Sequence, residues 1–200
     1  MRVDEAMVES IGASPIAMVV TNPDRADNPI EIANAAFCTL TGYTEREIVG
    51  RNCRFLGGEG TEAWIRDEVR AAIAGQRAVL AEILNYRSDG TPFRNGLMIA
   101  PQFGEDGKIA YFIGSQVDLG NNDVAALSLR RARAAAAVKQ LPDRQRQVLE
   151  GMASGLLNKQ IAYQLGIAEK TVKMHRALML ERLGGITTAE AIRLAVEAGL

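Results

Sequence analysis

The chain has 200 residues and a formal net charge of −1, and 48% of its residues are hydrophobic. A chain of this length and apolar content can bury one large core or two smaller ones. Its two cysteines, Cys38 and Cys53, are too few for a disulfide framework or a zinc site, which fits a reducing, cytoplasmic location. We expect no signal peptide, because acidic residues interrupt the first residues, and no transmembrane helix, because no apolar run is long enough.

Charge is distributed unevenly along the chain. Residues 1–120 contain 11 lysines and arginines against 17 acidic residues, a net charge of −6. Residues 121–200 contain 12 against 7, a net charge of +5. An acidic first part and a basic second part suggest two modules, of which the second favours polyanions. A difference of this size is also common between unrelated domains, so charge alone does not predict nucleic-acid binding.

The first module has the pattern of an α+β domain with one sheet and a helical face. Apolar residues predict a weak amphipathic helix at the N-terminus, two short strands and three further short helices before Gly75. Three longer strands follow, and Asp-Gly pairs typical of tight hairpins separate them. The predicted strands are residues 16–21, 30–32, 79–87, 91–101 and 108–117, and the predicted helices are 3–11, 34–42, 44–48 and 61–74.

The stretch 50–60, GRNCRFLGGEG, places Cys53 between Arg51 and Arg54. Arginines beside a cysteine favour the thiolate and attract anions, so the local chemistry suits a reactive sulfur near a phosphorylated ligand. On residue chemistry alone, a small buried cysteine with two solvated arginines is the more ordinary interpretation. We interpret the glycines at 57, 58 and 60 as a flexible turn, because a phosphate-binding loop would carry a lysine.

The string NCRFL at 52–56 resembles the signature of LOV domains, the flavin-binding branch of the PAS fold that senses blue light. The resemblance covers about residues 11–117 and implies a five-stranded antiparallel sheet. It also implies that Cys53 bonds reversibly to the flavin after illumination. The chain departs from many LOV domains at Gly57, where they have glutamine, and this leaves the detailed flavin contacts and the adduct lifetime open.

The same resemblance assigns the residues around the cofactor, which is expected to be FMN rather than FAD. Three amides, in the strand sequences NYRSDGTPFRN and YFIGSQ, correspond to the amides of the family that face the flavin. Each asparagine could instead be a turn or strand-edge residue that bonds to local backbone. Two arginines correspond to the residues that contact the phosphate in the family. The expected flavin-binding residues are Asn52, Cys53, Arg54, Leu56, Arg70, Asn85, Asn95, Phe112 and Gln116.

Residues 121–140 form a predicted helical connector that is rich in alanine and arginine. Val124, Leu127, Ala134 and Val138 recur at roughly helical spacing, so one face of this helix can dock. An inert spacer and a signalling element are equally compatible with this pattern.

The second module, residues 141–200, has helical periodicity throughout. Val172, His175, Met179 and Leu183 recur at three- and four-residue steps, which indicates a buried stripe. The opposite face carries lysines and suits the major groove and its phosphates. We expect His175 to be packed and hydrogen-bonded rather than a metal ligand, because no second ligand is near.

This second module resembles the helix-turn-helix domain of LuxR-type (GerE-like) transcription regulators. The resemblance is carried by Arg144, Val148-Leu149, Gly155, Asn158-Lys159, Ile161-Ala162, Leu165-Gly166-Ile167, Thr171-Val172-Lys173-Met174-His175 and Leu183. It implies an all-α, four-helix domain that binds double-stranded DNA and a last helix that serves dimerisation. The expected DNA-binding residues are Lys159, Lys170, Thr171, Lys173, Met174 and Arg176.

The helix caps of this second module are unequal. Leu157 and Ala168 stand where the family usually has serine, so the recognition helix is expected to begin without a side-chain cap. Thr187 and Glu190 have the spacing of a capping box at the start of the last helix.

Together these observations predict a light-regulated DNA-binding transcription factor and not an enzyme. Its domains are expected at 1–120, 121–140 and 141–200, and it is expected to be a monomer in darkness and a homodimer on illumination. In darkness the last helix, with Ile192 and Val196, should pack against the sheet. A redox or small-ligand sensor that holds flavin without photochemistry is the first alternative. A flavin-dependent enzyme is the second, although the sequence offers no nicotinamide site.

Overall fold

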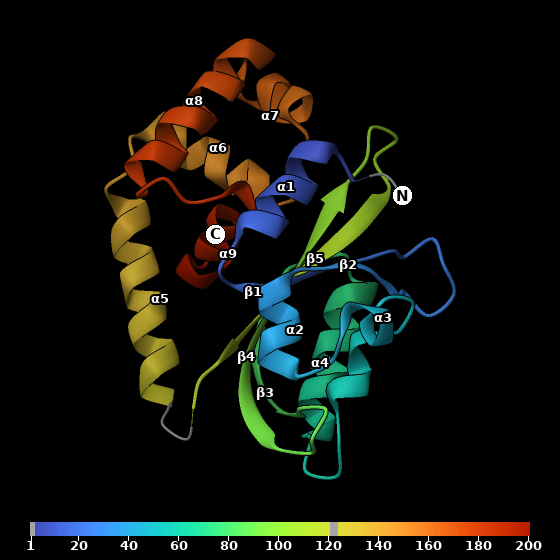
Figure 1. The fold of residues 1–200 in the computed structure, drawn as a ribbon. Helices are drawn as coiled ribbons and strands as arrows, with labels where there is room; N and C mark the ends of the chain where they lie inside the picture. The colour runs from blue at the N-terminus through green and yellow to red at the C-terminus, as the bar shows by residue number, and fades with distance from the viewer. Residues whose placement is uncertain (1–2, 121–123) are drawn as a thin grey trace.

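The structure is a computed structural model, and it describes residues 3–120 and 124–200 (Figure 1). A five-stranded antiparallel sheet in the order β2-β1-β5-β4-β3 forms the centre of the first module, as the sequence predicted. Gly90 (φ 82°) and Gly107 (φ 74°) adopt the left-handed conformation in the two hairpin turns. The strands are β1 Ala17–Thr21, β2 Ile30–Ala33, β3 Val79–Tyr86, β4 Pro92–Phe103 and β5 Ile109–Asp118.

Short helices cover one face of this sheet. The buried amide of Asn34 caps α2 by accepting from the Phe37 N–H at 2.9 Å, and it also accepts from the Met18 N–H of β1 at 3.0 Å. Its Nδ2 donates to the Ile11 carbonyl at 3.0 Å, so one side chain ties α1, α2 and the sheet together. The helices on this face are α2 Ala35–Thr41, α3 Glu45–Ile48, the 3₁₀ helix η1 Cys53–Leu56 and α4 Ala63–Ala74. The sequence analysis did not predict η1.

The second module lies against the other face of the sheet. Its helices, together with the N-terminal α1 and the connector α5, are α1 Glu5–Ala13, α5 Val124–Lys139, α6 Asp143–Ala153, α7 Asn158–Leu165, α8 Glu169–Arg182 and α9 Thr188–Ala198. Figure 1 shows α9 between α5 and the sheet, with α7 and α8 farthest from the strands. Ala134 and Val138 of α5 are buried, as predicted, whereas the side chains of Val124 and Leu127 lie outside the described residues.

One hydrophobic core joins the two modules. Strand alternation turns Met18, Met98 and Ile113 toward the second module, where they share a buried cluster with Ile192 and Leu149. The expected packing of the last helix on the sheet is therefore present: Ile192 is fully buried and Val196 packs at the edge of the same cluster. No helix within the described residues is both long and apolar enough to cross a bilayer.

Candidate functional site

The 3₁₀ helix η1 positions Cys53 as its first residue. Asn52 caps this helix by accepting from the Arg54 N–H at 3.1 Å. The Asn52 Nδ2 donates to the carbonyls of Asp27, at 2.7 Å, and Asn28, at 3.3 Å. Both of these residues have positive φ angles, 72° and 46°, so the turn they form presents two carbonyls to one amide. Asn52 thus fixes the loop that holds the cysteine, and its own amide is already satisfied by backbone.

The Cys53 thiol is protonated at neutral pH. The residue is half-buried, and desolvation raises the pKa of its thiol to about 12. Neither flanking arginine opposes this shift, because Arg51 lies over the Phe55 ring at 4.2 Å and Arg54 pairs with Asp27. The expectation that the arginines favour a thiolate is therefore wrong. The guanidinium groups find other partners, and desolvation decides the ionisation of the sulfur.

Three buried amides lie on the helix-covered face of the sheet. Asn95 and Gln116 are 1% and 2% exposed, and Asn95 donates through its Nδ2 to the Asn85 Oδ1 at 2.8 Å. Because Leu97 pairs with Gln116 in the ladder, Asn95 and Gln116 face the same side of neighbouring strands. Within the part of the chain that the structure describes, the Asn95 Oδ1 and the Gln116 Oε1 are buried without a hydrogen-bond partner. Each such orphan costs about 1–3 kcal/mol, which predicts a ligand with polar groups at this position.

The apolar side chains on this face form two separate clusters. One surrounds Phe37, Ile48 and Leu56 and includes Cys53 at its margin, whereas the other joins Ile65 of α4 to β3 and β4. A ligand that fits this face needs apolar surface against the clusters and hydrogen-bonding groups against the amides. An isoalloxazine ring has both, since its pyrimidine edge carries donors and acceptors. The residues present therefore fit the expected flavin.

The two arginines expected at the phosphate lie on the surface. Arg54 pairs with Asp27, and Arg70 pairs with Asp67 at 2.9 Å. Each guanidinium is mostly exposed and has only a weakly held carboxylate partner. Either side chain could exchange this partner for a phosphate, although the structure does not bring the two arginines into contact. Phe112 is buried and shares a sheet face with the amides.

Two of the glycines that follow Cys53, Gly58 and Gly60, pack closely against Tyr86 in the turn that the sequence predicted. A Cβ atom on Gly58 would lie 2.5 Å from the Tyr86 ring, and one on Gly60 would lie 2.7 Å from the Tyr86 hydroxyl. The Gly60 N–H donates to this hydroxyl at 3.0 Å. Tyr86 thus packs against the segment after the 3₁₀ helix, and a side chain at either glycine would require the tyrosine to shift.

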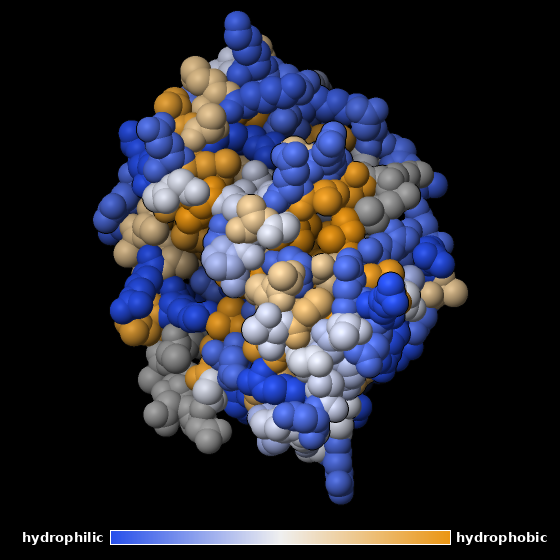
Figure 2. All heavy atoms as spheres, viewed as in Figure 1, coloured by the Kyte–Doolittle hydropathy of each residue, from blue (hydrophilic) through white to orange (hydrophobic). Residues whose placement is uncertain are grey.

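The expected DNA-binding residues divide into two groups. Lys170, Lys173 and Met174 are exposed on α8, and Lys173 pairs with Glu169 of its own helix at 3.1 Å. Thr171 is half-buried beside them. Figure 2 shows hydrophilic residues over much of the region where α7 and α8 lie, as a DNA-facing surface requires.

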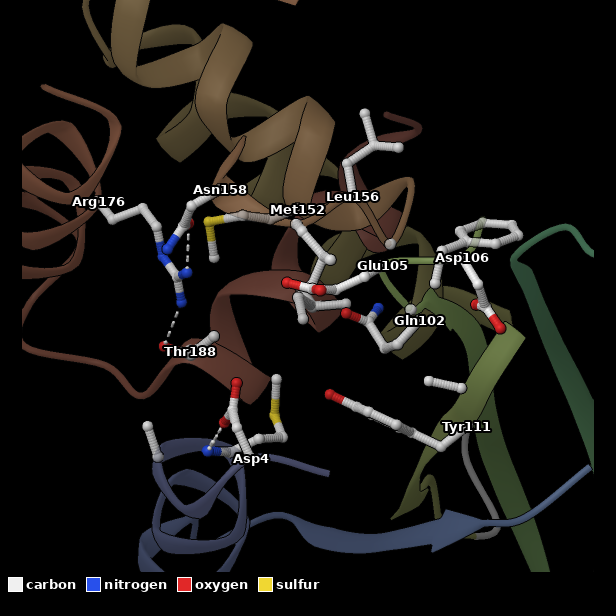
Figure 3. Close-up of a pocket in the computed structure, with 18 residues that line it drawn as sticks. Asp4, Gln102, Glu105, Asp106, Tyr111, Met152, Leu156, Asn158, Arg176 and Thr188 are labelled. Atoms are coloured by element: carbon white, nitrogen blue, oxygen red, sulfur yellow. Dashed lines mark hydrogen bonds between the residues drawn. The ribbon is translucent and has the colours of Figure 1, made fainter. Parts of the chain in front are cut away.

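The second group is engaged at the junction of the modules. Lys159 pairs with Glu105 of the β4–β5 hairpin at 3.1 Å. Arg176 points inward, where it donates to the Asn158 Oδ1 at 2.7 Å and the Thr188 Oγ1 at 3.4 Å (Figure 3). Desolvation lowers the pKa of this guanidinium. The sequence analysis expected Arg176 to contact DNA together with the lysines, but polar partners from α7 and α9 hold it on the inner side of α8.

The caps follow the sequence prediction. Ala168 and Leu157 provide no side-chain cap, although the Leu157 N–H donates to the Gln160 Oε1 at 2.7 Å. Thr187 accepts from the Glu190 N–H at 3.2 Å, and the Thr187 N–H donates to the Glu190 carboxylate at 2.8 Å. The predicted capping box at the start of α9 is therefore confirmed.

His175 is half-buried, as expected for a packed residue. Its Nδ1 nevertheless has no hydrogen-bond partner within residues 3–120 and 124–200, so the expected hydrogen bond at this atom is missing. In the same described residues, no group of histidines, cysteines and carboxylates could hold a metal ion.

Comparison with known families separates the same two modules. The PAS domain model matches residues 15–120, and the model for bacterial regulatory proteins of the luxR family matches residues 139–195. These matches confirm the combination that the sequence motifs predicted.

Among curated proteins, a blue-light-activated histidine kinase of Rhizobium johnstonii is 54% identical over 102 residues, which are 51% of this chain and 30% of that protein. Blue-light-activated histidine kinase 1 of Erythrobacter litoralis is 42% identical over 121 residues, 60% of this chain and 34% of the kinase. This chain thus spans about a third of the length of these relatives, and the shared part lies in a different fusion.

Among solved structures, the LOV domain of the Erythrobacter litoralis EL346 blue-light-activated histidine kinase is 39% identical, with a TM-score of 0.52. The match covers 54% of this chain and 99% of that domain. A LOV protein from Rhodobacter sphaeroides matches 97% of this chain and 91% of its own chain at a TM-score of 0.61, but it is 24% identical and shares the fold alone.

Proposed function

The chain belongs to the PAS domain family, and we propose that it is a blue-light-regulated transcription factor in which a flavin-binding LOV domain controls a LuxR-type DNA-binding domain. The observation that carries this proposal is the pair of orphaned acceptors, the Asn95 Oδ1 and the Gln116 Oε1, on the face that also holds Cys53. Without a ligand that donates hydrogen bonds, two neighbouring buried acceptors would cost about 2–6 kcal/mol together.

The proposed cofactor is FMN, which when bound would supply a ring that blue light makes reactive toward sulfur. Asn85, Asn95 and Gln116 would bind the polar edge of this ring, and Leu56 and Phe112 would contact its apolar surfaces. Arg54 and Arg70 would hold the phosphate at the surface, and Asn52 would fix the loop that carries the cysteine. Cys53 would keep its proton in darkness, because its thiol pKa is raised, and form the reversible bond after illumination.

DNA binding is assigned to the exposed face of α8. Lys170, Thr171, Lys173 and Met174 would enter the major groove or contact its flanking phosphates. Lys159 could join them once Glu105 releases it, because the two side chains form an exposed pair that costs little to separate. Binding should be strongly salt-dependent, since each phosphate contact releases counterions.

The arrangement of the modules suggests how light would control this binding. The residues by which α9 could pair with a second copy of the chain, including Ile192, are buried against the sheet. Light-driven loosening of α9 would expose them and free Lys159 at the same time. Shifting the ratio of loosened to packed molecules from 1:99 to 99:1 requires about 5.5 kcal/mol of differential stabilisation. A homodimer on paired half-sites would then be the DNA-binding form.

The experiment that tests this function is an absorbance spectrum of protein purified in darkness, recorded before and after blue light. We expect a flavin band that bleaches on illumination and recovers in darkness. Cys38→Ala should behave like the native chain, whereas Cys53→Ala should keep the band without bleaching. A stable flavin band that light leaves unchanged would favour a redox or ligand sensor, and turnover of reduced nicotinamide would favour an enzyme.

A further inference from the structure

A cavity of about 630 Å³ lies at the junction of the two modules, on the side of the sheet opposite the proposed flavin site. Its walls come from α1, the β4–β5 hairpin, the turn before α7, α8 and the start of α9 (Figure 3). This volume lies within the range of about 300–1,000 Å³ that is typical of small-molecule sites. Because both modules contribute walls, the complete cavity exists only while they are packed together.

Tyr111 of β5 offers this cavity an unused hydrogen-bonding group. The residue is 7% exposed, and its hydroxyl points into the cavity (Figure 3). It makes no hydrogen bond with any residue that the structure describes. A buried tyrosine hydroxyl normally has a partner. Desolvation raises the pKa of this phenol, so it remains a donor at neutral pH.

Arg176 brings a positive charge to the opposite wall. Its two hydrogen-bond acceptors, Asn158 and Thr188, are neutral, and no carboxylate among the described residues forms an ion pair with it. Partly buried cations are normally paired with an anion. A carboxylate suits this position, because its two oxygens match the planar fork of a guanidinium.

The rest of the cavity limits the size and charge of its ligand. Met7, Met152 and Ile192 supply apolar surface next to the polar groups. Asp4 also lines the cavity, where its carboxylate caps α1 through the Met7 N–H at 2.7 Å and acts electrostatically on Arg176 and Tyr111. Glu105 and Asp106 line the cavity as well, and the Glu105 carboxylate pairs with Lys159 at 3.1 Å. Three resident carboxylates beside one guanidinium disfavour a ligand with two or more negative charges.

We propose that this cavity binds a small amphipathic monocarboxylate. Its carboxylate would accept hydrogen bonds from Arg176 and Tyr111, and its apolar body would lie over Met7, Met152 and Ile192. Such a ligand contacts both modules, so it would stabilise their packed arrangement and oppose their separation. On the proposed function, the protein would therefore combine a light signal with a chemical one, and the two would act in opposite directions on DNA binding.

Calorimetric titration of octanoate into the 200-residue protein in darkness tests the site itself. 1-Octanol has the same apolar chain without the charge, and octylamine reverses the charge. We expect octanoate to bind at least about tenfold more tightly than 1-octanol, a difference of about 1.4 kcal/mol, and octylamine not to bind.

Two variants make the test specific without disturbing the fold. Tyr111→Phe keeps the ring and removes only the hydroxyl, and it should weaken octanoate binding about tenfold. Asp4→Asn keeps a helix-capping side chain and removes the negative charge, so it should strengthen binding. Unchanged flavin absorbance and melting midpoint would show that both variants are folded.

Three results would each overturn the proposed site. These are a failure of octanoate to bind, octanoate binding no tighter than that of 1-octanol, and an octanoate affinity that both variants leave unchanged. The link to regulation has a separate readout. Octanoate should lower DNA affinity, and bound DNA should lower octanoate affinity by the same factor, because coupling between two binding sites is reciprocal. Blue light should also lower octanoate affinity. Specific octanoate binding that light does not affect would support the site but contradict the proposed coupling between the modules.

Discussion

Arg193 of α9 donates a hydrogen bond to the hydroxyl of Ser115 in β5, the residue directly before Gln116 in that strand. Neighbouring side chains of a strand point to opposite faces, so Ser115 meets the second module while Gln116 faces the proposed flavin. Arg193 is 2% exposed and also pairs with Glu197 at 2.7 Å. Strand β5 therefore carries two functional positions in succession. Gln116 is the proposed light-sensing amide, and Ser115 holds Arg193, so the Ser115–Arg193 hydrogen bond is the buried anchor of α9. A small shift of β5 would disturb a buried charge, which tolerates lost partners poorly.

Ser115→Ala tests whether this anchor holds α9 on the sheet. The variant removes one acceptor from a buried guanidinium, and a lost hydrogen bond to a buried charge costs about 1.5–3 kcal/mol. We expect DNA binding in darkness to increase about tenfold or more, with a normal photocycle. Ser88→Ala is the matched control, because the Ser88 hydroxyl bonds to the Gly42 carbonyl within the first module.

Replacing the charged pair by apolar residues should have the opposite effect. Uncharged substitutes for a buried ion pair are often neutral or stabilising, so Arg193→Leu combined with Glu197→Leu should keep α9 docked. This double variant should bleach normally in light while its DNA affinity stays low. Increased DNA binding in darkness by the double variant, or none by Ser115→Ala, would contradict the role of the anchor.

Gln116→Leu tests the relay on the other side of the same strand. The Gln116 Oε1 is buried and has no hydrogen-bond partner among the described residues. An amide can rotate to exchange the donor and acceptor that it presents. Leucine cannot respond in this way. The variant should still bleach under blue light but should transmit little of the signal to DNA affinity. Full light-driven dimerisation and DNA binding in this variant would show that the signal passes elsewhere.

The ionisation of Cys53 gives a prediction about pH. With its pKa raised to about 12, the thiol keeps its proton from pH 6 to pH 9, whereas an ordinary cysteine would lose it with a midpoint near 8.5. The infrared S–H band of Cys53 in darkness should be constant over this range and absent in Cys53→Ala. A band that disappears with a midpoint near pH 8.5 would indicate that the thiol is not desolvated.

The missing cap of α8 predicts a stabilising substitution. Ala168 has the backbone conformation of an N-cap, with φ −72° and ψ 148°, but no side-chain acceptor. Ala168→Ser should raise the free energy of unfolding by about 0.5–2 kcal/mol. Ala177→Ser, at an exposed position inside the same helix, should not stabilise the protein. An unchanged melting midpoint for Ala168→Ser would contradict the expected cap.

The sequence predicted those features that depend on nearby residues. Asn34 and Gly42 bound α2, and Thr187 with Glu190 begins α9, because caps depend on three or four consecutive positions. The match of YFIGSQ to the family motif predicted that Gln116 would be a buried amide, and it is.

The features that the sequence did not predict depend on distant partners. Arg176 turns inward because Asn158 and Thr188 lie beside it in the fold, and Arg193 is buried because Ser115 meets it across the module boundary. The thiol of Cys53 is neutral because burial raises its pKa, while the two arginines beside it in the sequence contact Phe55 and Asp27. Charge and spacing along the chain carry no information about these contacts.

The central claim is that bond formation at Cys53 controls DNA affinity, and a dissociation constant measured in darkness and in blue light tests it most directly. The DNA should be a duplex selected from a random pool by the illuminated protein, and an absorbance spectrum should accompany each measurement. We predict that the native chain binds at least about tenfold more tightly in light, a shift of about 1.4 kcal/mol, and that Cys53→Ala shows no difference. Equal affinities in darkness and light for a native chain whose flavin band has bleached would contradict the account.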